Sequence, residues 1–130
     1  MRITEAFEVT GWEQTVLDEL AEGPPRSRAT VTKTFSGGLE GASAAVVLVC
    51  GEAAYTAQER FDGRIGDRSG TFVIQHGAVT GEAADAEGRP VSPGVVVPGS
   101  GTGELAGITG TVTFRHDETG AVFMLDFELG

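Results

Sequence analysis

The segment AYTAQERFDGRIGDRSGTFVIQHG, residues 54–77, decides the fold class. Two runs rich in aromatic and β-branched residues are joined by a short glycine-containing connection, a pattern that predicts a β-hairpin. Successive side chains on a strand point to opposite faces of the sheet. Glu59 is therefore predicted to share an apolar face with its neighbours two residues away. The residues grouped on one face by this alternation are Tyr55, Ala57, Glu59 and Phe61 in the first run, and Phe72, Ile74 and His76 in the second.

The register of this hairpin stays open at this point. The connection GRIGDRSG, residues 63–70, fits two pairings that differ by one residue. A slip of one residue moves a whole strand face to the other side of the sheet. His76 is thus predicted either on the same face as Glu59 or on the opposite one.

The same alternation of short apolar runs with Gly, Asp, Ser and Pro clusters continues along the chain, which is typical of an all-β protein. About eight strands are expected, a number that suits an eight-stranded antiparallel β-barrel of lipocalin-like shape. The length of 130 residues and the 40% hydrophobic content fit a single domain over residues 1–130. A helical turn or two is predicted in WEQTVLDEL, residues 12–20, before the Gly-Pro-Pro at 23–25. The expected strands are residues 4–11, 28–35, 43–50, 54–62, 71–79, 91–97, 110–115 and 121–128.

Composition excludes several function classes. A net charge of −10 makes nucleic acid an unfavourable partner, since phosphate binding relies on Lys and Arg, and it disfavours an anionic membrane surface. No apolar run approaches the roughly 20 residues of a membrane span, and MRITEAFEVT does not resemble a secretory signal, so a cytoplasmic protein is expected. With Cys50 as the single cysteine and only two histidines, we expect no disulfide, no metal site and no cofactor.

The glycine-rich segment VPGSGTGELAGITG, residues 97–110, resembles a phosphate-binding loop but lacks its context. A dinucleotide loop must connect a strand to a helix, whereas the residues after Gly103 are broken by further glycines and lead into a strand. The segment also lacks the lysine of a P-loop and the glycine that precedes a hydrolase serine by two residues. We therefore expect turns and close backbone contacts at a barrel rim, with Leu105 and Ile108 plugging that end.

Three blocks give the chain a family resemblance: VTKTFSGGLEG (31–41), ERFDGRIGDRSGTFVIQHGA (59–78) and the glycine-rich segment above. Their order and spacing resemble the bacterial family called domain of unknown function 3224. The resemblance implies an eight-stranded barrel similar to allene oxide cyclase and to the dirigent proteins, which handle apolar small molecules and are commonly oligomeric. The segment 81–94 is longer and richer in Pro and Gly than the family pattern, and a typical aromatic near Gly94 is missing. Both departures would alter a ligand preference at a barrel mouth.

Glu59 and His76 are the candidate catalytic residues. A carboxylate on an apolar face either has a raised pKa and exchanges a proton near pH 7, or is paired with a cation such as Arg28, Arg60 or Arg64. His76 is either its acid–base partner or a rim histidine bonded to a loop carbonyl. Trp12 is expected in the core or as a cap over one barrel end, Cys50 as a buried thiol, and His116 in a solvated turn. The candidate ligand-binding residues are Tyr55, Phe61, Phe72, Ile74, Trp12 and Cys50.

These residues suggest a metal- and cofactor-independent cyclase or isomerase that encloses a small, largely apolar molecule. A non-catalytic lipocalin-like carrier and a barrel that acts through its oligomer surface are the alternatives. AAVVLVC (44–50) and VFMLDF (122–127) look apolar on both faces, so a homo-oligomer is expected, a dimer before a trimer.

Overall fold

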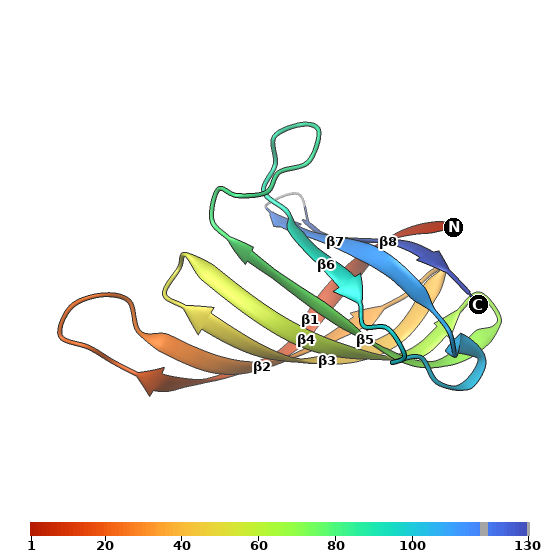
Figure 1. The fold of residues 1–130 in the computed structure, drawn as a ribbon, viewed down its shortest axis with the longest axis horizontal. Helices are drawn as coiled ribbons and strands as arrows, with labels where there is room; N and C mark the ends of the chain where they lie inside the picture. Colours follow the sequence, from red (N-terminus) through yellow and green to blue (C-terminus); the bar gives the residue numbers. More distant parts are fainter. Residues whose placement is uncertain (118–119, 130) are drawn as a thin grey trace.

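The computed structural model describes residues 1–117 and 120–129 and forms a closed, all-antiparallel barrel (Figure 1). Each strand pairs with the next along the chain, and the first pairs with the last, which confirms the predicted eight-stranded barrel. One short 3-10 turn, η1 (Gly103–Leu105), lies in the connection between the sixth and seventh strands. The strands are β1 (Arg2–Asp18), β2 (Arg26–Phe35), β3 (Leu39–Cys50), β4 (Ala54–Ile65), β5 (Arg68–Val79), β6 (Ser92–Val96), β7 (Thr109–Asp117) and β8 (Gly120–Glu128).

The predicted helix at residues 12–20 is wrong, because β1 continues as a strand to Asp18. Trp12 pairs with Val31 of β2, and Val16 pairs with Ser27, with register irregularities on either side of this stretch. Hydrogen bonding to β2 overrides the weak helical spacing of the apolar residues, as tertiary context commonly does. The result is a long β1–β2 hairpin that projects beyond the rest of the barrel (Figure 1).

The β4–β5 pairing settles the register that the sequence left open. Ala57 lies opposite His76, Glu59 opposite Ile74, and Phe61 opposite Phe72. Residues directly opposite each other in an antiparallel pair share a face of the sheet. Glu59 and His76 therefore both point into the barrel.

One end of the barrel is filled by its own side chains, and we call it the packed half. Leu105 and Ile108 from the β6–β7 connection are almost fully buried there, so the predicted plug is confirmed. Gly101 permits this tight connection, because a Cβ on it would lie 2.1 Å from the carbonyl oxygen of Leu105. Seven of the fifteen buried residues in this cluster are phenylalanines: Phe7, Phe35, Phe61, Phe72, Phe114, Phe123 and Phe127.

The opposite end, which we call the open half, is lined by small side chains. Its buried cluster consists of Ala29, Val31, Ala45, Val47 and Ala57 on β2, β3 and β4. The strand wall is incomplete at this end. β1 pairs with β8 only as far as Ala6, and β5 pairs with β6 over three residues. Small inward side chains inside an incomplete wall leave space that the packed half does not have.

Candidate functional site

A cavity of about 440 Å³ occupies the open half. Its walls are largely apolar, and the rings of Phe7 and Phe114 from the packed half also line it. Trp12 lines the cavity too, but its side chain remains 55% exposed and donates from its indole nitrogen to Gln14 Oε1. Of the two positions expected for Trp12, the exposure excludes the core and leaves that of a cap at one end of the barrel. Other apolar lining residues include Val31, Ala45, Val47, Val49, Val79 and Val91.

A network of hydrogen-bonded polar side chains, buried except for the half-buried Tyr55, lies where the open half meets the packed half. Glu59 is 0% exposed, and its Oε1 accepts hydrogen bonds from Lys33 Nζ at 3.0 Å and from His76 Nε2 at 2.8 Å. Its Oε2 accepts a hydrogen bond of 2.5 Å from Ser43 Oγ. Tyr55 Oη lies 2.9 Å from Nδ1 of His76 and completes the network on the cavity side.

These contacts decide the ionisation of Glu59. Burial raises the pKa of its carboxyl, but the hydrogen bond from His76, the charge of Lys33 and the hydrogen bond from Ser43 together lower the pKa from 4.5 to about 2. The predicted rise toward neutrality is therefore wrong. The pairing alternative holds with Lys33 as the cation in place of an arginine, and Arg64 instead pairs with Glu40 at 2.6 Å.

The ionised carboxylate of Glu59 also fixes the direction of its hydrogen bond with His76. A carboxylate only accepts, so Nε2 of His76 carries a proton and donates to Glu59. In the tautomer with Nδ1 unprotonated, that nitrogen accepts a hydrogen bond from the Tyr55 hydroxyl. The pKa of Tyr55 is raised, first by burial, with the negative charge of Glu59 adding to the effect, so the hydroxyl keeps its proton. Tyr55, His76 and Glu59 thus form a hydrogen-bonded series from the cavity inward.

Lys33 is the group that the sequence reasoning missed. Its ammonium lies 4.4 Å from the ring centroid of Phe114 and 4.9 Å from that of Phe7, and it lines the cavity. Aromatic faces attract a cation, which helps to hold this buried charge. The signal was present in VTKTF, where strand alternation places Lys33 on the same face as its apolar neighbours two residues away.

The other predicted site residues divide between the two halves. Phe61, Phe72 and Ile74 lie in the packed half and do not line the cavity, so the structure does not bring them to the site. Cys50 is half-buried at the end of β3, next to a lining glycine but outside the lining itself. His116, predicted in a solvated turn, is exposed but lines the cavity beside Phe7.

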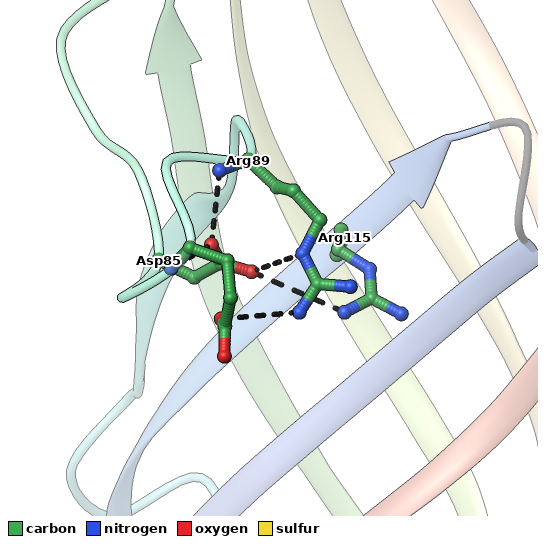
Figure 2. A network of polar contacts seen from close by, with 4 residues as sticks. Asp85, Arg89 and Arg115 are labelled. Atoms are coloured by element: carbon green, nitrogen blue, oxygen red, sulfur yellow. Dashed lines mark hydrogen bonds and ion pairs between the residues drawn. The ribbon is translucent and has the colours of Figure 1, made fainter.

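The long β5–β6 connection forms part of the cavity mouth through Ala83 and its neighbours. Figure 2 shows how polar contacts fix it: Asp85 Oδ1 accepts from the backbone N–H of Arg89 at 2.9 Å, and Oδ2 accepts from Arg89 Nε at 2.8 Å. Arg115 of β7 lies 4.0 Å from the same carboxylate. The backbone hydrogen bond from Arg89 is the main cause that lowers the pKa of Asp85. These contacts tie the connection to the barrel wall.

Within residues 1–117 and 120–129, no group of three or more His, Cys, Asp and Glu side chains is placed to hold a metal ion. The described part of the chain also contains no helix long and apolar enough to cross a bilayer. The polar side chains that line the cavity are those of Glu52, Thr80, Ser92, His116 and, where the open half meets the packed half and forms what we call the cavity floor, Lys33, Tyr55 and His76.

The fold and the site together define a class of protein. It comprises closed eight-stranded antiparallel barrels that have a cavity at one end, next to a network of hydrogen-bonded polar side chains. The chain belongs to the DUF3224 family, described as proteins of unknown function, whose model matches residues 3–129. It is similar to the crystal structure of a DUF3224-family protein of unknown function from Shewanella oneidensis MR-1. The two are 25% identical with a TM-score of 0.75, and the match covers 100% of this chain and 98% of that one. Comparison with curated proteins gives no match. The resemblance to allene oxide cyclase stays a prediction.

Proposed function

We propose that the protein encloses a small, largely apolar molecule in the open half of the barrel and catalyses a proton-transfer isomerisation there without metal or cofactor. The observation that carries this proposal is an apolar cavity of about 440 Å³ whose floor is formed by Lys33, His76 and Tyr55, with Glu59 fully buried behind them. A volume of this size suits a small organic molecule, and apolar walls with a few convergent polar groups are typical of ligand sites.

The network of polar side chains supports an enzyme over a plain container. Removing ionised groups from water is costly, and apolar residues of similar volume would hold the barrel together at least as well. Glu59 stays ionised at neutral pH, so it acts as a positioning residue and not as the group that exchanges protons with the ligand. The proton-transfer roles belong to His76 and Tyr55, which line the cavity. Glu59 orients the ring of His76 and stabilises it when it becomes charged.

A lipocalin-like carrier remains the second candidate, because the mouth of the cavity is open. Trp12 is more than half exposed there. Easy entry and release suit a protein that only transports its ligand. The two functions share the binding site and differ in whether the bound molecule changes.

Binding is tested first, with Trp12 as the reporter, since it is the only tryptophan and lines the cavity. We expect small aromatic hydrocarbons and ketones to change its fluorescence in a saturable way. Val47→Phe fills the cavity and should abolish the response. The matched control is Val46→Phe on the same strand, where the side chain points outward and is 46% exposed. Equal responses in both variants would contradict the proposed site.

A further inference from the structure

We propose that the molecule bound in the open half carries a neutral carbonyl oxygen, which accepts a hydrogen bond from Lys33 at the cavity floor. The inference rests on the proposed function and names the chemical class of its ligand. It starts from an asymmetry in the ion pair. Lys33 lines the cavity, whereas its partner Glu59 is fully buried and does not line it. A ligand in the cavity therefore meets the N–H donors of Lys33 and does not meet the carboxylate oxygens of Glu59.

Lys33 has donors left for a ligand. An ammonium has three N–H groups. Among the contacts of the described residues, Lys33 makes one hydrogen bond, to Glu59, and its other close neighbours are the rings of Phe7 and Phe114. The face of an aromatic ring attracts the ammonium charge, but the ring has no lone pair that could accept a conventional hydrogen bond. A ligand oxygen beside Lys33 would provide an acceptor for its remaining N–H groups.

Charge decides between a carbonyl and a carboxylate. Lys33 and Glu59 already balance each other in a site with little access to water. A carboxylate ligand would bring a second negative charge close to Glu59, and an unbalanced buried charge is unfavourable. Glu52 at the cavity lining and the net charge of −10 also oppose the approach of an anion. A ketone or aldehyde oxygen accepts from Lys33 without adding charge, while its hydrocarbon part contacts the Ala and Val walls.

Three probes of similar shape test the inference by isothermal titration calorimetry. They are 2-acetylnaphthalene, its isostere 2-isopropenylnaphthalene, which has CH₂ in place of the oxygen, and 2-naphthoate. We expect the ketone to bind about 10-fold more tightly than the alkene, the effect of one hydrogen bond to a charged donor, and more tightly than the acid. In the double variant Lys33→Met/Glu59→Gln, which removes both charges together, this preference should disappear while the affinity for the alkene is kept.

The outcomes separate the two proposals. If neither the ketone nor the alkene binds, the proposed function fails. If the two bind equally to the wild-type protein, if the preference survives in the double variant, or if naphthoate binds best, the carbonyl inference fails and the site remains. An infrared measurement on the wild-type protein keeps the test independent of variant folding. The stretching frequency of a ¹³C-labelled ketone should fall on binding relative to its value in hexane, and an unchanged frequency would overturn the inference.

Discussion

Tyr55 Oη lies 2.9 Å from Nδ1 of His76, across the β4–β5 pair. On its other side the imidazole donates from Nε2 to Glu59, so the ring connects a hydroxyl at the cavity with a carboxylate that no ligand reaches. In the proposed reaction, a proton taken up at Tyr55 from the cavity passes to His76, and Glu59 stabilises the resulting positive ring. This relationship is the basis of the first prediction.

We expect the wild-type protein to convert a β,γ-unsaturated ketone, such as cyclohex-3-en-1-one, to its conjugated isomer. The α-proton passes to the Tyr55 oxygen as the hydroxyl proton passes to Nδ1 of His76. Lys33 donates to the enolate oxygen, and the proton then returns to the γ-carbon, with no net oxidation or reduction. Tyr55→Phe and His76→Gln should each lower the rate by about 10²-fold or more, as followed by proton NMR.

Calorimetry with 2-acetylnaphthalene is the control for this prediction, because Tyr55→Phe should still bind the ketone. A wild-type protein that binds ketones but shows no conversion above the buffer rate would leave the carrier as the function.

The second prediction concerns acid stability. Glu59 has a folded pKa of about 2 against an ordinary value of 4.5. A lowered pKa contributes stability that is complete above pH 4.5 and is lost as the pH falls toward 2, on the order of 3 kcal/mol in total. Urea unfolding at a series of pH values should show this loss in the wild-type protein. The variant Lys33→Met/Glu59→Gln, which lacks the titrating pair, should show a smaller loss over the same range; parallel curves would contradict the assignment.

The third prediction compares a broken ion pair with a removed one. Glu59→Gln leaves the Lys33 ammonium buried without its carboxylate, and we expect a loss of about 3–5 kcal/mol in the free energy of unfolding. Lys33→Met/Glu59→Gln should be more stable than this single variant, because it buries no unpaired charge. Denaturant unfolding at pH 7 measures both. If the double variant is the less stable of the two, the charge balance assigned to this pair is wrong.

The fourth prediction concerns the glycine-rich segment at residues 97–110. A Cβ on Gly110 would lie 2.2 Å from the backbone oxygen of Asp126, so Gly110→Val should lower the melting temperature markedly. The exposed Ala106→Val in the same segment should change it little. ATP and NAD should leave the melting temperature of the wild-type protein unchanged, since a ligand that binds only the folded state would raise it. A nucleotide-dependent rise would restore the phosphate-loop interpretation.

The fifth prediction is the oligomeric state, which we propose to be a homodimer at micromolar concentration. Val46 and Leu48 point outward from β3 and are 46% and 52% exposed, so they form an apolar strip on the barrel wall. Covering this strip with a second copy would bury it. Light scattering should give a dimer for the wild-type protein and a monomer for Val46→Asp/Leu48→Asp; a wild-type monomer would refute the proposal.

The sequence predicted most of the strands and the eight-stranded barrel because the period-two alternation is strong in most strands. It failed at Trp12–Asp18, where Val16 and Leu17 fit a short helix equally well and only pairing with β2 decides the outcome. Local spacing carries no information about a partner strand. The same limit left the β4–β5 register open until the pairing of Ala57 with His76 fixed it.

The site was predicted in part for a similar reason. Tyr55, Glu59 and His76 were found because they interrupt apolar faces, and the structure joins them in one network. Phe61 and Phe72 were assigned to the ligand because alternation shows which residues face inward but not at which end of the barrel they lie. The low pKa of Glu59 depends on the hydrogen bond from His76 on the neighbouring strand and on the charge of Lys33, a residue 26 positions away along the sequence, so a single strand could not reveal it.

The division between a phenylalanine-filled end and an end lined by alanine and valine places the aromatic core and the proposed ligand site in different parts of the barrel. Substitutions of Ala45 or Val47 reshape the chamber without touching the aromatic cluster. If the open half binds a small molecule as proposed, substitutions there would change which compound is accepted while the packed half stays constant. In protein design, the residues that line the open half could likewise be exchanged while those of the packed half are kept.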